Sequence, residues 1–281
     1  MLLTIDIGNT NFTLGVFLGE DLAHIWRLAT LRERTSDEIG LFITQAMASQ
    51  KLDPAALDGV IISSVVPPLT APTASAVQDY IGKKPVLIEN GLNIGMPVLY
   101  DKPSDVGADR VVNAVAAYHM YGRAWQRPLI IVDFGTATTF DAVTGAGEYL
   151  GGILCPGIGI SADALFQRTA KLPRVDVRKP ARLIGRATVE SIQSGLFFGY
   201  VAMVEGLVER MRVELSKDEP QRVVCIATGG LAPVLAEETH VIQHSHPDLT
   251  LQGLRLIWER QHQRVAAGVA SNASNESRES R

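Results

Sequence analysis

The chain of 281 residues has only two cysteines, Cys155 and Cys225, and each stands in an apolar stretch. Two such thiols do not build a disulfide framework, so we expect reduced core residues and a cytoplasmic protein. Basic residues are not in excess either, since 26 Lys and Arg face 30 Asp and Glu and leave a net charge of -4. Nucleic-acid-binding domains carry a basic face, so we expect no nucleic-acid partner.

Long hydrophobic runs are also lacking, and we expect no export signal. No uninterrupted apolar stretch approaches the ~18 residues that a membrane span needs, so we expect no membrane partner. The stretch Met1–Asp6 reaches a carboxylate at once, unlike a signal peptide, and is typical of a strand. What is present is 46% hydrophobic residues, the balance of a globular protein with a large core. Residues 259–281 end in a polar stretch, and we predict a disordered tail there.

The sequence repeats one layout. Residues 2–13 and 129–140 each show an apolar strand, then Asp, an apolar residue, Gly and a run of hydroxyl or amide side chains. Asp6 matches Asp133 at the same offset, and a second β-run follows in each copy. Two chance Asp-x-Gly turns are the alternative, but the shared order of elements favours duplication. Helical spacing of apolar residues follows at 37–48, 109–121 and 189–215.

Strands followed by helices, twice over, predict an α/β fold of two duplicated halves packed around a cleft. We place the first half at residues 1–115 and the second at residues 116–258.

The two Asp-x-Gly loops are suited to phosphate. Each is predicted to be a hairpin in which glycine relieves strain at the tight position. Many neutral donors then converge on one small volume, which suits an oxyanion, and Asp6 and Asp133 at strand ends could hold a bridging cation. A plain hairpin with a capping Asx side chain is the alternative. The side chains that supply the donors in the first loop are Asn9, Thr10, Asn11 and Thr13.

Other nucleotide motifs are absent or weak. The sequence contains no Gly-x-x-x-x-Gly-Lys-[Ser/Thr], which excludes a Walker-type loop. Residues 157–162 fit a Gly-x-Gly-x-x-Ala dinucleotide pattern, but Pro156 stands directly before them. We interpret this stretch as the start of a helix after a Pro-Gly turn.

Gly107-Ala-Asp-Arg110 opens a predicted helix. Asp109 can be a helix cap or a partner of the helix dipole. It can instead accept the proton of a substrate hydroxyl while Arg110 binds an anionic group. Phosphoryl transfer needs positioning, a cation and an orienting base, and Asp suffices because the alcohol proton leaves late.

Five motifs together closely resemble the type III pantothenate kinases of the acetate and sugar kinase, Hsp70 and actin superfamily. The resemblance covers roughly residues 1–255 and implies duplicated actin-like (ribonuclease H-like) domains with mixed sheets around a central ATP cleft. The motifs are Asp6-Ile-Gly-Asn-Thr-Asn11, Gly107-Ala-Asp-Arg110, Asp133-Phe-Gly-Thr-Ala-Thr138, Gly151-Gly-Ile-Leu-Cys-Pro-Gly157 and Thr228-Gly-Gly230.

The resemblance implies a kinase that phosphorylates the primary hydroxyl of pantothenate with ATP, the first step of coenzyme A synthesis. By the same likeness Asp109 is the base, Asp6 lies near Mg²⁺, and Asp133 ligates a monovalent cation, K⁺ or NH₄⁺. The residues implied to bind ATP are Asp6, Ile7, Gly8, Asn9, Thr10, Asn11, Phe12, Thr13, Thr136, Gly229 and Gly230. Those implied to bind pantothenate are Tyr100, Gly107, Ala108, Asp109, Arg110 and, from the partner subunit of a homodimer, Thr188.

One departure and two rival functions remain. Ala187 stands where the family has Asn before the equivalent of Thr188, which bears on the contact across the dimer. A sugar or acetate kinase would keep both phosphate loops but has no reason to keep Tyr100 together with Gly107-Ala-Asp-Arg110. A non-enzymatic accessory or regulatory protein has no physical need for the carboxylates of Asp6, Asp109 and Asp133.

Overall fold

The computed structural model describes residues 1–88 and 94–262, and the chain forms two compact units. The first unit contains the described parts of Met1–Gly95, Ser104–Ala116 and Thr250–Arg281, and the second contains Met96–Pro103 and Ala117–Leu249. The units are therefore interleaved along the chain, whereas the sequence pattern predicts a single boundary near residue 115.

The C-terminal part differs from the prediction in one respect. Residues 249–262 are helical, so residues 259–262 do not belong to a disordered tail. This helix is ordered because its apolar side chains, among them Leu251, Leu254 and Ile257, are buried in the first unit. The remainder of the predicted tail, 263–281, lies outside the described residues.

The first unit contains a five-stranded mixed sheet with the strand order β3-β2-β1-β4-β5. The pairs β1–β2 and β2–β3 are antiparallel, and the pairs β1–β4 and β4–β5 are parallel. The strands are β1 (Leu2–Ile7), β2 (Asn11–Leu18), β3 (Asp21–Ala29), β4 (Gly59–Ser64) and β5 (Val86–Ile88). The helices are α1 (Ser36–Ser49), α2 (Pro67–Ile81) and α3 (Ala108–Ala117), together with residues 249–262.

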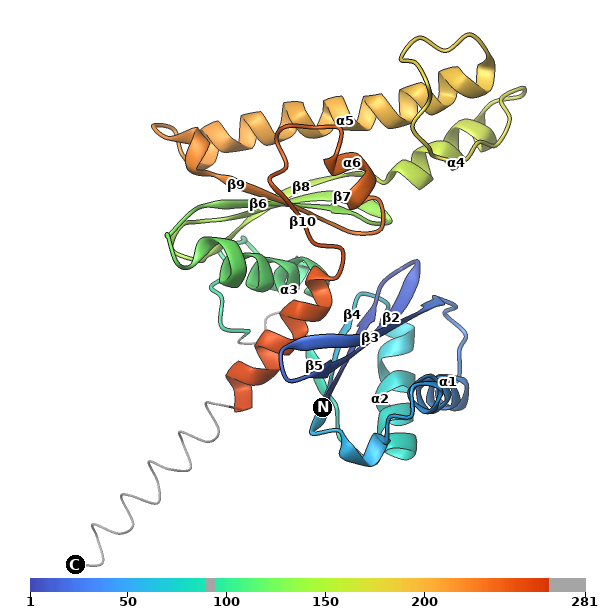
Figure 1. Cartoon of the computed structure of the whole chain (residues 1–281), viewed down its shortest axis with the longest axis vertical. Helices are drawn as coiled ribbons and strands as arrows, with labels where there is room; N and C mark the ends of the chain where they lie inside the picture. Colours follow the sequence, from blue (N-terminus) through green and yellow to red (C-terminus); the bar gives the residue numbers. More distant parts are fainter. Residues whose placement is uncertain (89–93, 263–281) are drawn as a thin grey trace, which may run out of the picture. The chain divides into compact units, whose positions relative to one another are not determined.

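The two faces of this sheet differ in their side chains. One face carries large apolar residues such as Ile5 and Ile62, which pack with α1 and α2 in one core (Figure 1). The opposite face has no side chain at Gly15 and Gly59, which lie beside the apolar residues Leu2 and Ile61. A β-carbon on Gly59 would overlap the ring of Trp258, so the helix over residues 249–262 packs directly against this face.

The second unit contains a five-stranded sheet with the order β10-β9-β6-β7-β8. Its strands are β6 (Leu129–Phe134), β7 (Ala137–Val143), β8 (Tyr149–Pro156), β9 (Val224–Thr228) and β10 (His244–Ser245). The pairs β6–β7 and β7–β8 are antiparallel, and the pairs β6–β9 and β9–β10 are parallel. Strand for strand this repeats the first sheet, with β6 in the place of β1, and it confirms the predicted duplicated α/β fold of ribonuclease H-like topology.

Helix α5 (Thr188–Leu215) lies along one face of this second sheet (Figure 1). With 28 residues and a mean hydropathy of 1.3 over its most apolar window, α5 is long and apolar enough to cross a membrane. Its buried side chains Phe197, Val201 and Val204, however, pack in one core with Val132 and Phe140 of the sheet. We therefore assign α5 as a core helix of the second unit. The other helices of this unit are α4 (Ile158–Arg168) and α6 (Ala232–Ala236).

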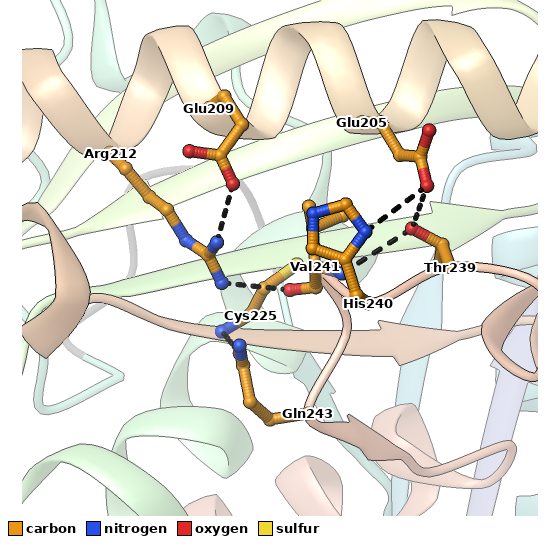
Figure 2. Close-up of polar contacts among 8 residues, drawn as sticks. All are labelled: Glu205, Glu209, Arg212, Cys225, Thr239, His240, Val241 and Gln243. Carbon is orange, nitrogen blue, oxygen red and sulfur yellow. Dashed lines mark hydrogen bonds and ion pairs between the residues drawn. The ribbon is translucent and has the colours of Figure 1, made fainter.

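A polar network fastens the segment before β10 to α5 and β9, as Figure 2 shows. The guanidinium of Arg212 on α5 donates to the carbonyl of Val241 at 2.9 Å and pairs with Glu209 at 2.7 Å. The backbone N–H of Cys225 on β9 donates to the side-chain oxygen of Gln243 at 2.6 Å. Because buried polar groups are costly unless paired, this network fixes β10 beside β9.

Candidate active site

The hairpin between β1 and β2 forms the first predicted phosphate loop. The Gly8 N–H donates to the carbonyl of Asn11 at 2.9 Å and closes the turn. Gly8 is not in the left-handed region, so its φ is not the reason for glycine here. Glycine fits there because a β-carbon would lie 3.2 Å from the Asn11 carbonyl oxygen. Asn9, Thr10 and Asn11 are exposed, as a ligand contact requires.

Thr30 holds this loop in place. It directly follows β3, its hydroxyl donates to the Gly8 carbonyl at 2.7 Å, and its N–H donates to the Thr10 carbonyl at 3.0 Å. No motif in the sequence marks Thr30, because its contact with the loop depends on the pairing of β2 with β3. Two predicted ATP-binding residues, Ile7 and Phe12, have fully buried side chains in the core. Only their backbone is therefore available to a ligand.

Asp6 stands near the end of β1, half-buried, and is paired in register with Thr13 of β2 and Ser63 of β4. Side chains of register partners point to the same face of a sheet. Asp6 and Ser63 therefore share the face that carries Gly59 and is covered by residues 249–262.

Asp109 lies in the first turn of α3, within the same unit as Asp6. Its carboxylate accepts a 2.8 Å hydrogen bond from the Arg110 N–H. A β-carbon on Gly107 would lie 2.6 Å from Asp109 Oδ1 and 3.6 Å from Val65, so the start of α3 lies beside the residue that follows β4. Burial raises the pKa of the Asp109 carboxyl, and the Arg110 N–H and guanidinium oppose that rise. Arg110 itself is buried.

The second predicted phosphate loop is the hairpin between β6 and β7, closed by the Gly135 N–H, which donates to the Ala137 carbonyl at 3.1 Å. It is shorter than the first loop, and Gly135, like Gly8, is outside the left-handed region. Gly135 and Thr136 are exposed, and Asp133 is half-buried.

The Thr228-Gly-Gly230 motif begins at the end of β9, where Thr228 is the register partner of Asp133. Gly229 has a φ of 89°, in the left-handed region that favours glycine. A β-carbon there would lie 2.6 Å from Asp133 Oδ1 and 2.7 Å from the Phe134 carbonyl oxygen. Glycine at this position therefore lets the end of β9 approach Asp133 and the Phe134 main chain more closely than any side chain would allow. Gly230 is exposed, and a β-carbon on it would meet nothing within 4 Å.

The dinucleotide-like stretch is the start of a helix, as predicted. Gly157 is the N-cap of α4, directly after β8. A β-carbon on Gly157 would overlap the Thr136 carbonyl, so the helix start lies against the second loop.

Tyr100 belongs to the second unit. Residues 97–99 pair with Tyr149 at the start of β8, where the Leu99 N–H donates to the Tyr149 carbonyl at 2.8 Å. The Tyr100 ring then lies 3.3 Å from where Gly151, with a φ of 135°, would carry a β-carbon. The structure thus brings Tyr100 to the Gly151-Gly152 motif.

Thr188 is the first residue of α5 and is exposed. Ala187 is the N-cap, and it makes no side-chain capping bond. The preceding segment is held by the Arg186 N–H, which donates to Glu190 at 2.9 Å. An asparagine at this position could supply the side-chain cap that Ala187 cannot.

The predicted residues thus fall into two groups. The first unit brings together Asp6, Thr13, Gly107, Ala108, Asp109 and Arg110 on the carboxyl end of β1 and β4, with the first loop. The second unit brings together Asp133, Thr136 and Gly229 around the second loop, and it also carries Tyr100 and Thr188. Sequence reasoning missed Thr30 and Ser63. Ser63 had a faint signal, since two serines end an otherwise apolar strand.

Two sheets of one topology, each with an Asp-x-Gly hairpin on its central strand, define the class of duplicated ribonuclease H-like proteins. A sequence model of the type III pantothenate kinase family matches residues 2–210. The chain is 47% identical to the type III pantothenate kinase of Moorella thermoacetica over 92% of this chain and 99% of that protein. It is 50% identical to that of Myxococcus xanthus over 93% and 99%. The chain belongs to the type III pantothenate kinase family.

A solved structure gives a more distant likeness. The crystal structure described as a Baf family transcriptional activator from Campylobacter jejuni aligns with a TM-score of 0.53. The alignment covers 93% of this chain and 98% of that protein at 16% sequence identity. At this identity the likeness concerns the fold alone.

Proposed function

We propose that this chain transfers the γ-phosphoryl group of ATP to the primary hydroxyl of pantothenate, the first step of coenzyme A synthesis. The observation that carries the proposal is family membership over most of the chain, together with an Asp-x-Gly loop on the same strand of both sheets. Residues 6–13, Thr136, Gly229 and Gly230 bind ATP in this proposal. Tyr100, Gly107, Ala108 and Arg110 bind pantothenate.

Asp109 is the base that accepts the hydroxyl proton. Burial disfavours the charged carboxylate and raises its pKa, which makes it a stronger proton acceptor than an exposed Asp. The Arg110 N–H and guanidinium oppose this rise of the pKa by stabilising the carboxylate. Arg110 also supplies a positive charge beside the base, where an anionic part of the substrate can bind.

The residues present fit the two expected cations. Among the residues that the structure describes, no group of three or more His, Cys, Asp or Glu gathers to hold a metal. A site with one carboxylate suits Mg²⁺, which takes most of its ligands from water and substrate phosphates, and we assign Asp6 to it. When bound, Mg²⁺ offsets the negative charge on the transferred phosphate.

The monovalent cation, K⁺ or NH₄⁺, is assigned to Asp133. Support comes from the position of two oxygen atoms, since Asp133 Oδ1 and the Phe134 carbonyl oxygen lie 2.6 and 2.7 Å from one point beside Gly229. A carboxylate and a carbonyl are the oxygen donors that hard cations prefer.

We also propose a homodimer in which Thr188 reaches the pantothenate site of the partner subunit. Thr188 is exposed, and large apolar side chains nearby in the second unit are exposed as well. Leu183 and Ile184, just before α5, are 65% and 80% exposed, and Phe166 of α4 is 46% exposed. Apolar surface of this kind favours burial against another protein surface. Light scattering after gel filtration is expected to give twice the mass of one chain.

We propose that the protein acts in the cytoplasm. Both cysteines are free thiols, as a reducing compartment maintains them. Cys225 is structural, since burial raises the pKa of its thiol to about 12 and keeps it neutral.

The test of the function is ADP release measured with ATP, Mg²⁺, K⁺ and one acceptor at a time. Turnover is expected with pantothenate as the acceptor and with none of the control acceptors, which are glucose, glycerol and acetate. Turnover with a control acceptor would favour the sugar or acetate kinase alternative. Folded protein without turnover on any acceptor would favour the accessory-protein alternative.

A further inference from the structure

Ser63 is a buried hydroxyl without a partner in the described part of the chain. Its exposed fraction is 0%, and its Oγ has no hydrogen-bond partner among the described residues. An unsatisfied buried hydroxyl lowers the stability of a folded protein, because the group loses its hydrogen bonds to water and gains none in return. Alanine at this position of a strand would avoid that cost, so the folded chain alone gives no reason for the hydroxyl.

The pairing of the strands places Ser63 beside Asp6. The two residues are register partners in the parallel pair β1–β4 and point to the same face of the sheet. Neighbouring strands are about 4.8 Å apart, so a Ser hydroxyl is within reach of an Asp carboxylate on the next strand. One side-chain torsion moves the Ser63 Oγ among its three staggered positions while the backbone stays fixed.

The next residue, Ser64, shows what a structural serine looks like at the same strand end. Its side chain points to the other face of the sheet, where its Oγ accepts the Val66 N–H at 3.2 Å. It also accepts the hydroxyl of Thr70 at 2.9 Å. The hydroxyl of Ser64 therefore has a structural role at the start of α2. The hydroxyl of Ser63 has no such role among the described residues.

We propose that Ser63 is a positioning residue for the metal site, and that its hydroxyl donates a hydrogen bond to the Asp6 carboxylate when Asp6 binds Mg²⁺. The inference rests on the proposed role of Asp6. A carboxylate that ligates a metal has oxygen lone pairs left over, and a hydrogen bond to one of them fixes its orientation. Loss of such a partner lowers metal affinity by roughly 10–100-fold.

The test measures Mn²⁺ binding to the whole protein with saturating ADP, by the electron paramagnetic resonance signal of free Mn²⁺. The variants are Ser63→Ala, Ser63→Thr and the matched control Ser64→Ala. Ser63→Ala is expected to bind Mn²⁺ about 10-fold more weakly and to melt at the wild-type temperature or above. Ser63→Thr keeps the hydroxyl and is expected to retain most of the affinity. Ser64→Ala is expected to melt earlier with unchanged Mn²⁺ affinity.

Wild-type Mn²⁺ affinity in Ser63→Ala would overturn the inference, and so would equal weakening in Ser63→Ala and Ser64→Ala. If Ser63→Ala fails to fold, Ser63→Cys has nearly the same size and a much weaker donor, and it is expected to show the same loss. The variant Asp6→Asn distinguishes a failure of the proposed role of Asp6 from a failure of the proposed role of Ser63. Unchanged Mn²⁺ binding in Asp6→Asn would overturn the role of Asp6 and this inference together. Loss in Asp6→Asn with no effect in Ser63→Ala would overturn the inference alone.

Discussion

Gly229 lies against Asp133 so closely that a β-carbon on the glycine would be 2.6 Å from the carboxylate oxygen Oδ1. The Phe134 carbonyl oxygen is 2.7 Å from the same point, and Gly229 has a φ of 89°. Two of the motifs that resemble the family, one at Asp133 and one at Thr228-Gly-Gly230, are therefore in direct contact within the second unit.

This relationship predicts different outcomes for two neighbouring glycines. Gly229→Ala is expected to lower the unfolding free energy by about 1–3 kcal/mol, because it strains the backbone and forces the Phe134 main chain to move. Gly230→Ala meets open space and is expected to keep its stability. If ATP lies against Gly230, that variant raises the KM for ATP. Urea unfolding and ATP kinetics of the two variants check both expectations, and equal stability loss in both would contradict them.

Replacement of Asp109 tests the base. Asp109→Asn is expected to lose roughly 10²–10⁴-fold in turnover and still to bind ATP and pantothenate, as calorimetry would measure. Full activity in this variant would remove Asp109 from the base role. The same variant is expected to melt no earlier than the wild type, because burial of the charged carboxylate is unfavourable.

The pH dependence of the melting temperature tests whether folding raises the pKa of Asp109. The pKa of Asp109 is raised on folding, so the folded chain holds this proton at pH values where the unfolded chain has released it. Ionisation of Asp109 therefore lowers stability as the pH rises from the usual pKa through the raised one. Any advantage of Asp109→Asn in melting temperature should shrink on acidification through that window, and an advantage that grows would contradict the sign.

The monovalent cation assignment predicts that the rate falls steeply when Na⁺ replaces K⁺. Asp133→Asn is expected to have a low rate with either cation, because it removes the charged oxygen donor. Steady-state kinetics at constant ionic strength make the measurement. A wild-type rate that is indifferent to the cation would point away from Asp133 as a ligand.

The homodimer proposal predicts rescue between two defective subunits. Asp109→Asn and Thr188→Ala are each expected to be nearly inactive as homodimers. A mixed dimer has one site with Asp109 from one subunit and Thr188 from its partner, so activity should return. Co-expression with two affinity tags isolates the mixed dimer. If Thr188 acts within its own subunit, both sites stay defective and the mixed dimer remains inactive.

Replacement of Ala187 by asparagine is expected to stabilise the protein. Its φ of -140° and ψ of 157° are those of an N-cap, yet it makes no side-chain capping bond. Ala187→Asn is expected to raise the unfolding free energy by about 1 kcal/mol, since Asn can bond the free N–H groups of the first turn. Ala187→Val, a residue that cannot cap, is the control and should give no gain in urea unfolding.

Much of the fold could be predicted because its signals are local. Alternating apolar strands and the repeated Asp-x-Gly turn indicate two α/β copies, and both sheets have the same strand order. The interleaving could not be predicted, because it depends on contacts far apart in sequence. Gly59 and Trp258 are one such contact, and neither residue alone indicates which unit the last helix joins.

The site was predicted less completely, and for a similar reason. Asp6, Asp109 and Asp133 stand in motifs, so sequence alone could nominate them. Thr30 and Ser63 reach the site only through strand pairing, which no short motif records. The sequence predicts that glycine relieves strain in both loops, and neither glycine lies in the left-handed region. At Gly8 the reason for glycine is the close approach of the Asn11 carbonyl oxygen, which only the folded loop reveals.

The most direct test of the central claim follows the phosphoryl group itself. The protein is incubated with pantothenate and ATP carrying ¹⁸O in its γ-phosphoryl group, and the products are analysed by mass spectrometry. The account predicts labelled phosphopantothenate and ADP in equal amounts, with almost no labelled free phosphate. ADP and labelled free phosphate without phosphopantothenate would show hydrolysis instead of transfer, and would contradict the account.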